Sequence, residues 1–128
     1  MKLSFGTVLR DKFLQKAIRK LRIYISEFKS CFEELEIQPD NCESILISLS
    51  CDINKERVFS NSDNVFQIML PISDIPEDLR NNPKELFLYV ADKIIAGISR
   101  CPYLSSDNLH IIKNLFNKWK AEVLDKLS

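Results

Sequence analysis

The sequence predicts an α+β fold in which a small antiparallel sheet of two or three strands packs against three helices. The chain has 128 residues, of which 45% are hydrophobic and 28% charged, values typical of one soluble domain. Apolar residues recur with a helical period near both ends of the chain and with a period of two in its middle. We therefore expect a single domain over residues 1–128, with its elements in the order α-β-β(-β)-α-α.

The first predicted helix runs from about Leu9 to Leu35, and Thr7 can cap its start. One broad apolar face is expected to pack inward; it consists of Leu14, Ala17, Ile18, Leu21, Tyr24, Ile25, Phe28, Cys31, Phe32 and Leu35. Lys12, Lys16 and Arg19 lie on the opposite, solvated face. Ile23 points into this basic face, so it either packs on another element or is an exposed contact. The helix ends in the loop around Pro39.

The middle of the chain predicts two strands and a shorter third one. Residues Ser44–Ile53 alternate between apolar and mostly polar side chains, as in a strand with one buried face. A short strand is expected at Arg57–Phe59, and another over Val65–Ile72. Turns of a few residues separate them, which favours an antiparallel meander. Pro71 indicates an edge position or the end of a strand.

Two further helices are predicted in the C-terminal half. Residues 73–82 form a polar connection with a helical turn at Pro76–Leu79. The next helix has Pro83 in its first turn and spans Lys84 to about Arg100. It is apolar around more than half of its circumference, so we expect it to lie centrally, with Gly97 allowing close packing. The last helix, with its cap at 105–107, reaches about Leu127.

Cysteine, histidine and glycine spacing argue against an enzyme. The four cysteines (Cys31, Cys42, Cys51 and Cys101) have no zinc-binding or redox spacing, and His110 is the only histidine. We therefore expect no metal and no cofactor, with Cys31 and Cys51 serving as small core residues. Neither glycine of the chain opens a phosphate-binding loop. A Cys101–His110 nucleophile and base pair is the one enzymatic alternative that the sequence leaves.

The net charge is zero, but the charges are unevenly placed along the chain. Residues 1–32 carry a balance of +6, residues 33–78 of −9 and residues 79–128 of +3. Either these segments neutralise one another after folding, or the acidic ones gather into a surface for a basic partner. The carboxylates expected to form that surface are Glu33, Glu34, Glu36, Asp40, Asp52, Asp74, Glu77 and Asp78. We expect neither nucleic-acid nor membrane binding, because both need a dominant basic field.

Location and a family resemblance point to a cytoplasmic binding protein. Charge at Arg10 interrupts the N-terminus before a secretory signal core develops, so we expect a cytoplasmic protein. The stretch from Leu70 to Ile95, LPISDIPEDLRNNPKELFLYVADKII, resembles small bacterial immunity proteins of polymorphic toxins, including those of contact-dependent growth inhibition. The resemblance implies a non-enzymatic protein that binds and neutralises a cognate toxin domain, such as a nuclease. No functional residue follows from it by position.

Two other functions remain open at this stage. A secretion-type chaperone would hold an unfolded effector segment in an exposed apolar groove, using Ile23 or the apolar second helix. Such chaperones are often dimers, whereas a monomer is expected of an immunity protein. A small hydrolase or transferase using Cys101 is the third alternative.

Overall fold

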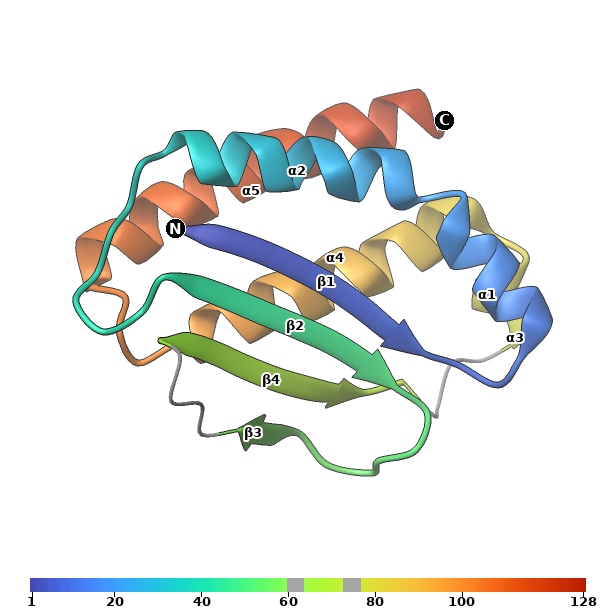
Figure 1. Ribbon diagram of the computed structural model, residues 1–128. Helices are drawn as coiled ribbons and strands as arrows, with labels where there is room; N and C mark the ends of the chain where they lie inside the picture. The colour runs from blue at the N-terminus through green and yellow to red at the C-terminus, as the bar shows by residue number, and fades with distance from the viewer. Residues whose placement is uncertain (60–63, 73–76) are drawn as a thin grey trace.

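The computed structural model contains one mixed sheet with helices against one of its faces (Figure 1). It describes residues 1–59, 64–72 and 77–128, with the backbone alone at Glu77 and Arg80. The strands are β1 (Lys2–Val8), β2 (Ser44–Ser50), β3 (Arg57–Phe59) and β4 (Val65–Pro71), in the spatial order β1-β2-β4-β3. The strand pairs β1–β2 and β2–β4 are parallel, and only β3–β4 is antiparallel. The α+β class predicted from the sequence is confirmed.

The predicted antiparallel meander is wrong in its pairing, although its strands are present. β3 does not lie between β2 and β4 in the sheet; it pairs with the outer edge of β4 and so carries the chain back to the other end of the sheet. This return lets β2 and β4 run parallel as direct neighbours. Periodicity reports which face of a strand is buried but not which strand lies beside it. Pro71 is the last residue of β4, and the end of a strand is one of the two positions that the sequence predicted for it.

The strand β1 was not predicted, and it takes the N-terminal residues that the sequence assigned to no element. Its Leu3 and Phe5 lie opposite Ile45 and Ile47 of β2, so they extend the apolar face of the sheet. Thr7 is part of this strand and is not a helix cap. Its pairing partner is more than 35 residues away along the chain, so no local pattern indicates the contact.

The predicted first helix is divided into α1 (Lys12–Arg19) and α2 (Arg22–Glu34). The side chain of Asp11 caps α1 by accepting hydrogen bonds from the backbone N–H groups of Phe13 and Leu14. Between the two helices, the Leu21 N–H donates to the Ile18 carbonyl at 2.9 Å, a spacing of three residues that tightens the turn. The tightened turn redirects the chain and buries Leu21, which is 2% exposed.

The C-terminal helices agree with the sequence prediction. They are α3 (Glu77–Arg80), α4 (Pro83–Ser99) and α5 (Ser106–Lys126). Asn82 caps α4 and Ser105 caps α5, each through a side-chain oxygen. α4 lies centrally, in contact with β2, β4 and α5. A Cβ atom at Gly97 would meet three side-chain atoms of Ile47 at 3.0–3.2 Å, so the predicted close approach is confirmed.

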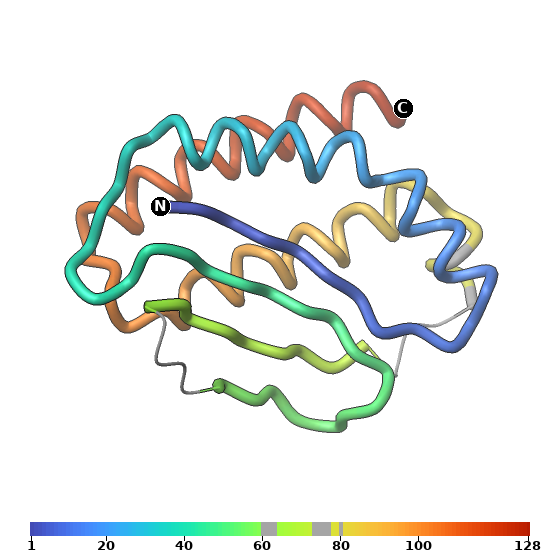
Figure 2. The backbone as a smooth tube through the Cα atoms, viewed as in Figure 1, coloured from blue at the N-terminus to red at the C-terminus, as the bar shows by residue number. Residues whose placement is uncertain are grey.

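An aromatic cluster joins α2, α4 and α5, which cross behind and above the sheet in Figure 2. The ring of Trp119 lies 4.8 Å from that of Phe28 and 5.1 Å from that of Phe87, measured between centroids. The Trp119 Nε1–H donates to the backbone carbonyl of Tyr24 at 2.9 Å. Burying an indole without a hydrogen-bond partner would be costly, so this bond fixes how α5 sits on α2.

Candidate functional site

The acidic residues singled out from the sequence fall into two groups at opposite ends of the sheet. Four of them lie at the amino ends of the parallel strands, on the end of α2 and the loop that follows it: Glu33, Glu34, Glu36 and Asp40. We call these four residues the acidic end. Asp52 follows the carboxyl end of β2, and Asp78 lies in α3. A strand of seven residues separates the two groups by roughly 20 Å. The structure therefore does not bring all of them onto one surface.

Two of the remaining predicted residues have no described side chain. Asp74 is not among the described residues, and the side chain of Glu77 is not described. Asp52 forms an intramolecular ion pair, in which one of its carboxylate oxygens lies 2.7 Å from the Arg10 guanidinium. Both of these side chains are well exposed, so the ion pair is readily exchanged for another partner.

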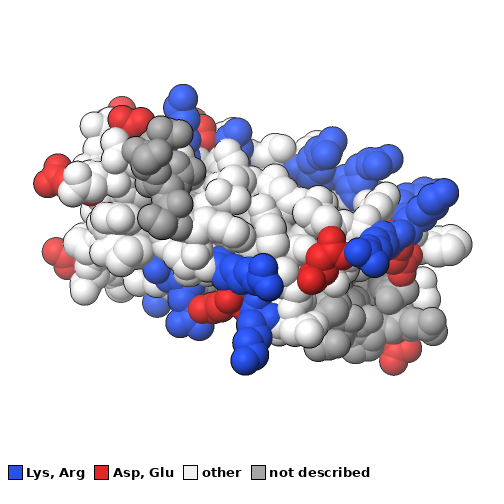
Figure 3. All heavy atoms as spheres, turned by 60° about the horizontal axis from the view of Figure 1, so that its bottom comes forward, with Lys and Arg blue, Asp and Glu red and all other residues white. Residues whose placement is uncertain are grey.

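The local backbone conformation is unfavourable for the side chains of the acidic end. Glu33 and Glu34 occupy the last turn of α2, and that turn has no basic residue. The negative end of a helix dipole repels carboxylates placed there. Glu36 has a φ of 55°, in the left-handed region that glycine adopts most easily. Within the described part of the chain, no ion pair involves any of the four carboxylates. Figure 3 shows several separate carboxylate groups at the left end of the molecule and others among the basic groups in the centre and at the right.

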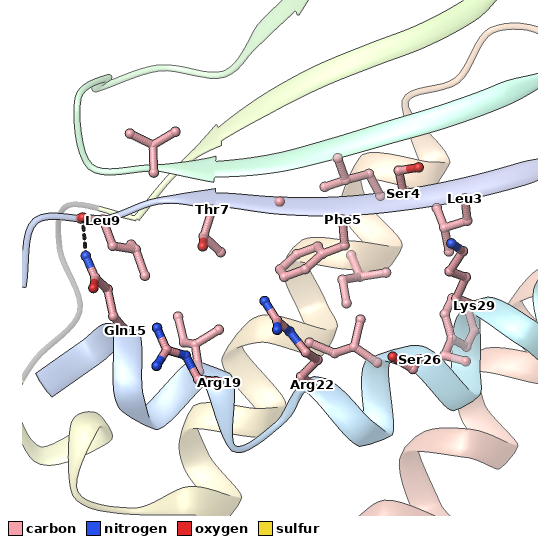
Figure 4. A pocket seen from close by; sticks show the side chains of 17 residues that line it. Leu3, Ser4, Phe5, Thr7, Leu9, Gln15, Arg19, Arg22, Ser26 and Lys29 are labelled. Carbon is pink, nitrogen blue, oxygen red and sulfur yellow. Dashed lines mark hydrogen bonds between the residues drawn. The ribbon is translucent and has the colours of Figure 1, made fainter. Parts of the chain in front are cut away.

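A groove that the sequence did not predict runs between β1 and the helices α1 and α2 (Figure 4). Its volume is about 730 Å³, and its floor is apolar, with Ile18, Ile25 and Ile94 among the residues that form it. The side chains of Arg19, Arg22 and Lys29 line its helical side, and no carboxylate among the described residues lines it. The sequence placed Arg19 on a solvated helix face. Only the presence of β1 beside α2 converts that face into one wall of a groove.

Cys101 does not have the properties of a nucleophile. It is 5% exposed at the end of α4, next to Cys42, which is 2% exposed. Burial raises the pKa of the Cys101 thiol from 9.0 to about 11, so the thiolate is scarce at neutral pH. His110 is exposed on α5. The expected core position of Cys31 is wrong, because this residue is exposed; Cys42 is buried in its place.

A metal-binding cluster and a helix that could span a membrane are both absent from the described residues. No three or more acidic, cysteine or histidine side chains among them converge as a metal site would require. Within the same residues, no helix combines the length and the apolar character needed to cross a bilayer.

Some large apolar side chains are exposed on the helices that flank the groove. Phe13 of α1 is 82% exposed and Ile23 of α2 is 64% exposed. Ile23 is thus exposed and does not pack on another element of the described chain, and its role as a contact stays a prediction. The apolar second helix of the sequence prediction is α4, whose apolar residues are largely buried in the core. It does not provide an exposed groove.

Comparisons of the chain with models of protein families, with curated proteins and with solved structures found no match.

Proposed function

We propose that this chain is an immunity protein that binds a cognate toxin domain and neutralises it through the acidic end. The observation that carries the proposal is the placement of Glu33, Glu34, Glu36 and Asp40 within eight residues of chain, without an ion pair among the described residues. Two local features of this segment, the carboxylates at a helix C-terminus and the positive φ of Glu36, oppose folding rather than help it. A segment that lowers stability in this way is expected where a binding function retains it.

The partner that fits the acidic end is a basic protein surface. A toxin domain that acts on nucleic acid carries Lys and Arg side chains where it binds phosphates. Carboxylates clustered at one end of this molecule steer such a surface into contact and then occupy the positions of the phosphates. Binding of this kind blocks substrate access and needs no chemistry in the inhibitor. A monomeric inhibitor is sufficient for it.

The test uses the toxin domain that an immunity protein is expected to have encoded beside its own gene. Cells that express the toxin domain are expected to stop growing, and co-expression of this chain is expected to restore growth. In the variant E34K/E36K/D40K, protection is expected to fall and the association rate with the purified toxin domain to drop by on the order of tenfold or more. Glu33 is left unchanged because its carboxylate accepts a 3.5 Å hydrogen bond from the Leu3 N–H.

The matched control is the variant D92K/E122K/D125K, which changes the net charge by the same amount. These three carboxylates are exposed on α4 and α5. The control is expected to protect cells as the unmodified chain does. Equal association rates and equal salt dependence for both triple variants would rule out the acidic end as the contact. Growth arrest that this chain does not relieve would rule out the immunity function itself.

The chaperone alternative is favoured by one observation, the exposure of Phe13 and Ile23. A chaperone that uses them is expected to be a stable dimer and to bind an unfolded effector segment. Mass measurement in solution separates the two functions. A monomer supports the immunity protein, and a dimer that the substitution Ile23→Ser dissociates supports the chaperone.

A further inference from the structure

The edge strand β1 has one unpaired side, and the groove runs along it. The Lys2 N–H donates to the Glu43 carbonyl, and the Val8 carbonyl accepts from the Cys51 N–H. In a parallel pair, alternate residues direct both backbone groups to the neighbouring strand. The even-numbered residues of β1 therefore pair with β2, and the odd-numbered ones, Phe5 and Thr7 among them, direct their N–H and C=O groups away from the sheet.

The groove follows β1 along most of its length, and Ile47 of β2 and Ile94 of α4 line it as well. All residues from Leu3 to Leu9 line it, although successive side chains of a strand point to opposite faces. What these residues share is the unpaired edge. At one end of that edge, the Leu3 N–H already donates to the carboxylate of Glu33, at 3.5 Å. The edge thus already donates a hydrogen bond to a carboxylate oxygen within this same molecule.

The opposite wall of the groove carries positive charge. Arg19 is the last residue of α1, and Arg22 and Lys29 belong to α2; all three line the groove. Figure 4 shows Arg19 and Arg22 reaching towards β1, and Lys29 near Leu3. None of the three forms an ion pair within the described residues, and no Asp or Glu lines the groove to neutralise them.

We propose that this groove binds an extended acidic segment of a partner protein, which adds to the sheet as a further strand beside β1. The backbone of the segment pairs with the unpaired groups of Phe5 and Thr7, as in other cases of strand addition to a sheet edge. Its alternate side chains reach either the apolar floor or the cationic wall. Charge complementarity selects an acidic occupant, because the charged side chains of this wall, Arg19, Arg22 and Lys29, are all cationic. The proposal does not depend on the role of the acidic end.

The binding probe is a fluorescein-labelled pool of eight-residue peptides with glutamate at alternate positions and valine, isoleucine or threonine between them. Fluorescence anisotropy is expected to show saturable binding with one peptide per chain. The same pool with lysine in place of glutamate is expected to bind at least about tenfold more weakly. Amide NMR spectra are expected to show the largest shifts and slowed hydrogen exchange at Phe5 and Thr7.

Two pairs of variants test the two halves of the recognition. The variant R19E/R22E is expected to lose at least about tenfold in affinity, whereas K12E/K16E, which reverses two exposed charges of α1 outside the groove, binds normally. Thr7→Pro removes one outward N–H without touching the β1–β2 pairing and is expected to weaken binding, whereas Thr7→Val keeps the N–H and binds normally.

Several results would overturn the proposal. These are absence of saturable binding up to 1 mM peptide, equal binding of the lysine pool, or equal loss in R19E/R22E and K12E/K16E. Binding that hexanoate blocks completely and that Thr7→Pro does not weaken would show a site for small carboxylates instead. A dimer that R19E/R22E dissociates would show that a second copy of this chain occupies the groove. None of these outcomes bears on whether the chain protects cells from a toxin.

Discussion

Replacing Gly97 by alanine tests the contact that sets the distance between α4 and the sheet. In an exposed helix position, glycine to alanine stabilises a protein by about 1 kcal/mol. At Gly97 the new methyl group would lie 3.0 Å from Cδ1, 3.1 Å from Cγ1 and 3.2 Å from Cγ2 of Ile47. Ile47 is fully buried, so its side chain can give way only if the core around it repacks. Inserting a methyl group into such a core costs about 1–3 kcal/mol.

The two effects together predict that Gly97→Ala lowers the free energy of unfolding by about 0–2 kcal/mol. The calibrating variant is Ala96→Gly, at the exposed neighbouring position of α4, which is expected to cost about 1 kcal/mol. Urea denaturation followed by the fluorescence of Trp119 measures both changes. If Gly97→Ala raised the free energy of unfolding by as much as Ala96→Gly lowers it, the close approach of α4 to the sheet would be contradicted.

A double-mutant cycle with Ile47→Val makes the test specific to this pair of residues. The substitution removes Cδ1, the atom closest to the new methyl group. Alone it is expected to cost about 0.5–1.5 kcal/mol. In the Gly97→Ala background it is expected to cost at least about 0.5 kcal/mol less, because it relieves the clash. Additive effects of the two substitutions would show that the residues do not constrain each other.

Three further predictions concern the buried groups of the core. Burial raises the pKa of the Cys101 thiol from 9.0 to about 11. The neutral thiol therefore stabilises the fold fully below pH 9, and about 3 kcal/mol of unfolding free energy is lost as the pH rises towards 11. In alkaline denaturation, Cys101→Ala is expected to remove this loss. An aromatic disulfide reagent is expected to modify Cys31 in the folded protein but Cys42 and Cys101 only after unfolding; immediate modification of all three would contradict their burial. Trp119→Phe is expected to lower the unfolding free energy by about 1–3 kcal/mol, because the Tyr24 carbonyl loses its indole donor; a change near zero in urea denaturation would show that the bond does not matter.

Local sequence signals were enough to predict the elements that are defined by interactions between neighbouring residues. Pro83 and the caps at Asn82 and Ser105 define where α4 and α5 begin, because capping side chains act on backbone groups two or three residues away. The alternation of apolar residues identified β2 and β4, since each strand buries one face. Gly97 indicated a close approach before its partner in the sheet was known.

The candidate sites depended on contacts between distant segments. The acidic end contains neighbours in sequence, so its carboxylates were recognised together; their separation from Asp52 follows from β2, which runs between the two groups. The groove was missed because the sequence placed Arg19 on a solvated helix face, and only the structure puts β1 beside the helices.

The sequence by itself determined the helices near the C-terminus, the buried faces of two strands and the uneven distribution of charge. Only the tertiary structure decided that β1 exists as a strand, that its neighbours run parallel, and that one of its edges is left unpaired beside a row of cations. The physical reason is the range of the interactions. Caps and periodicity act within one or two helical turns, whereas β1 gains its hydrogen bonds and its apolar contacts from β2, a partner more than 35 residues away.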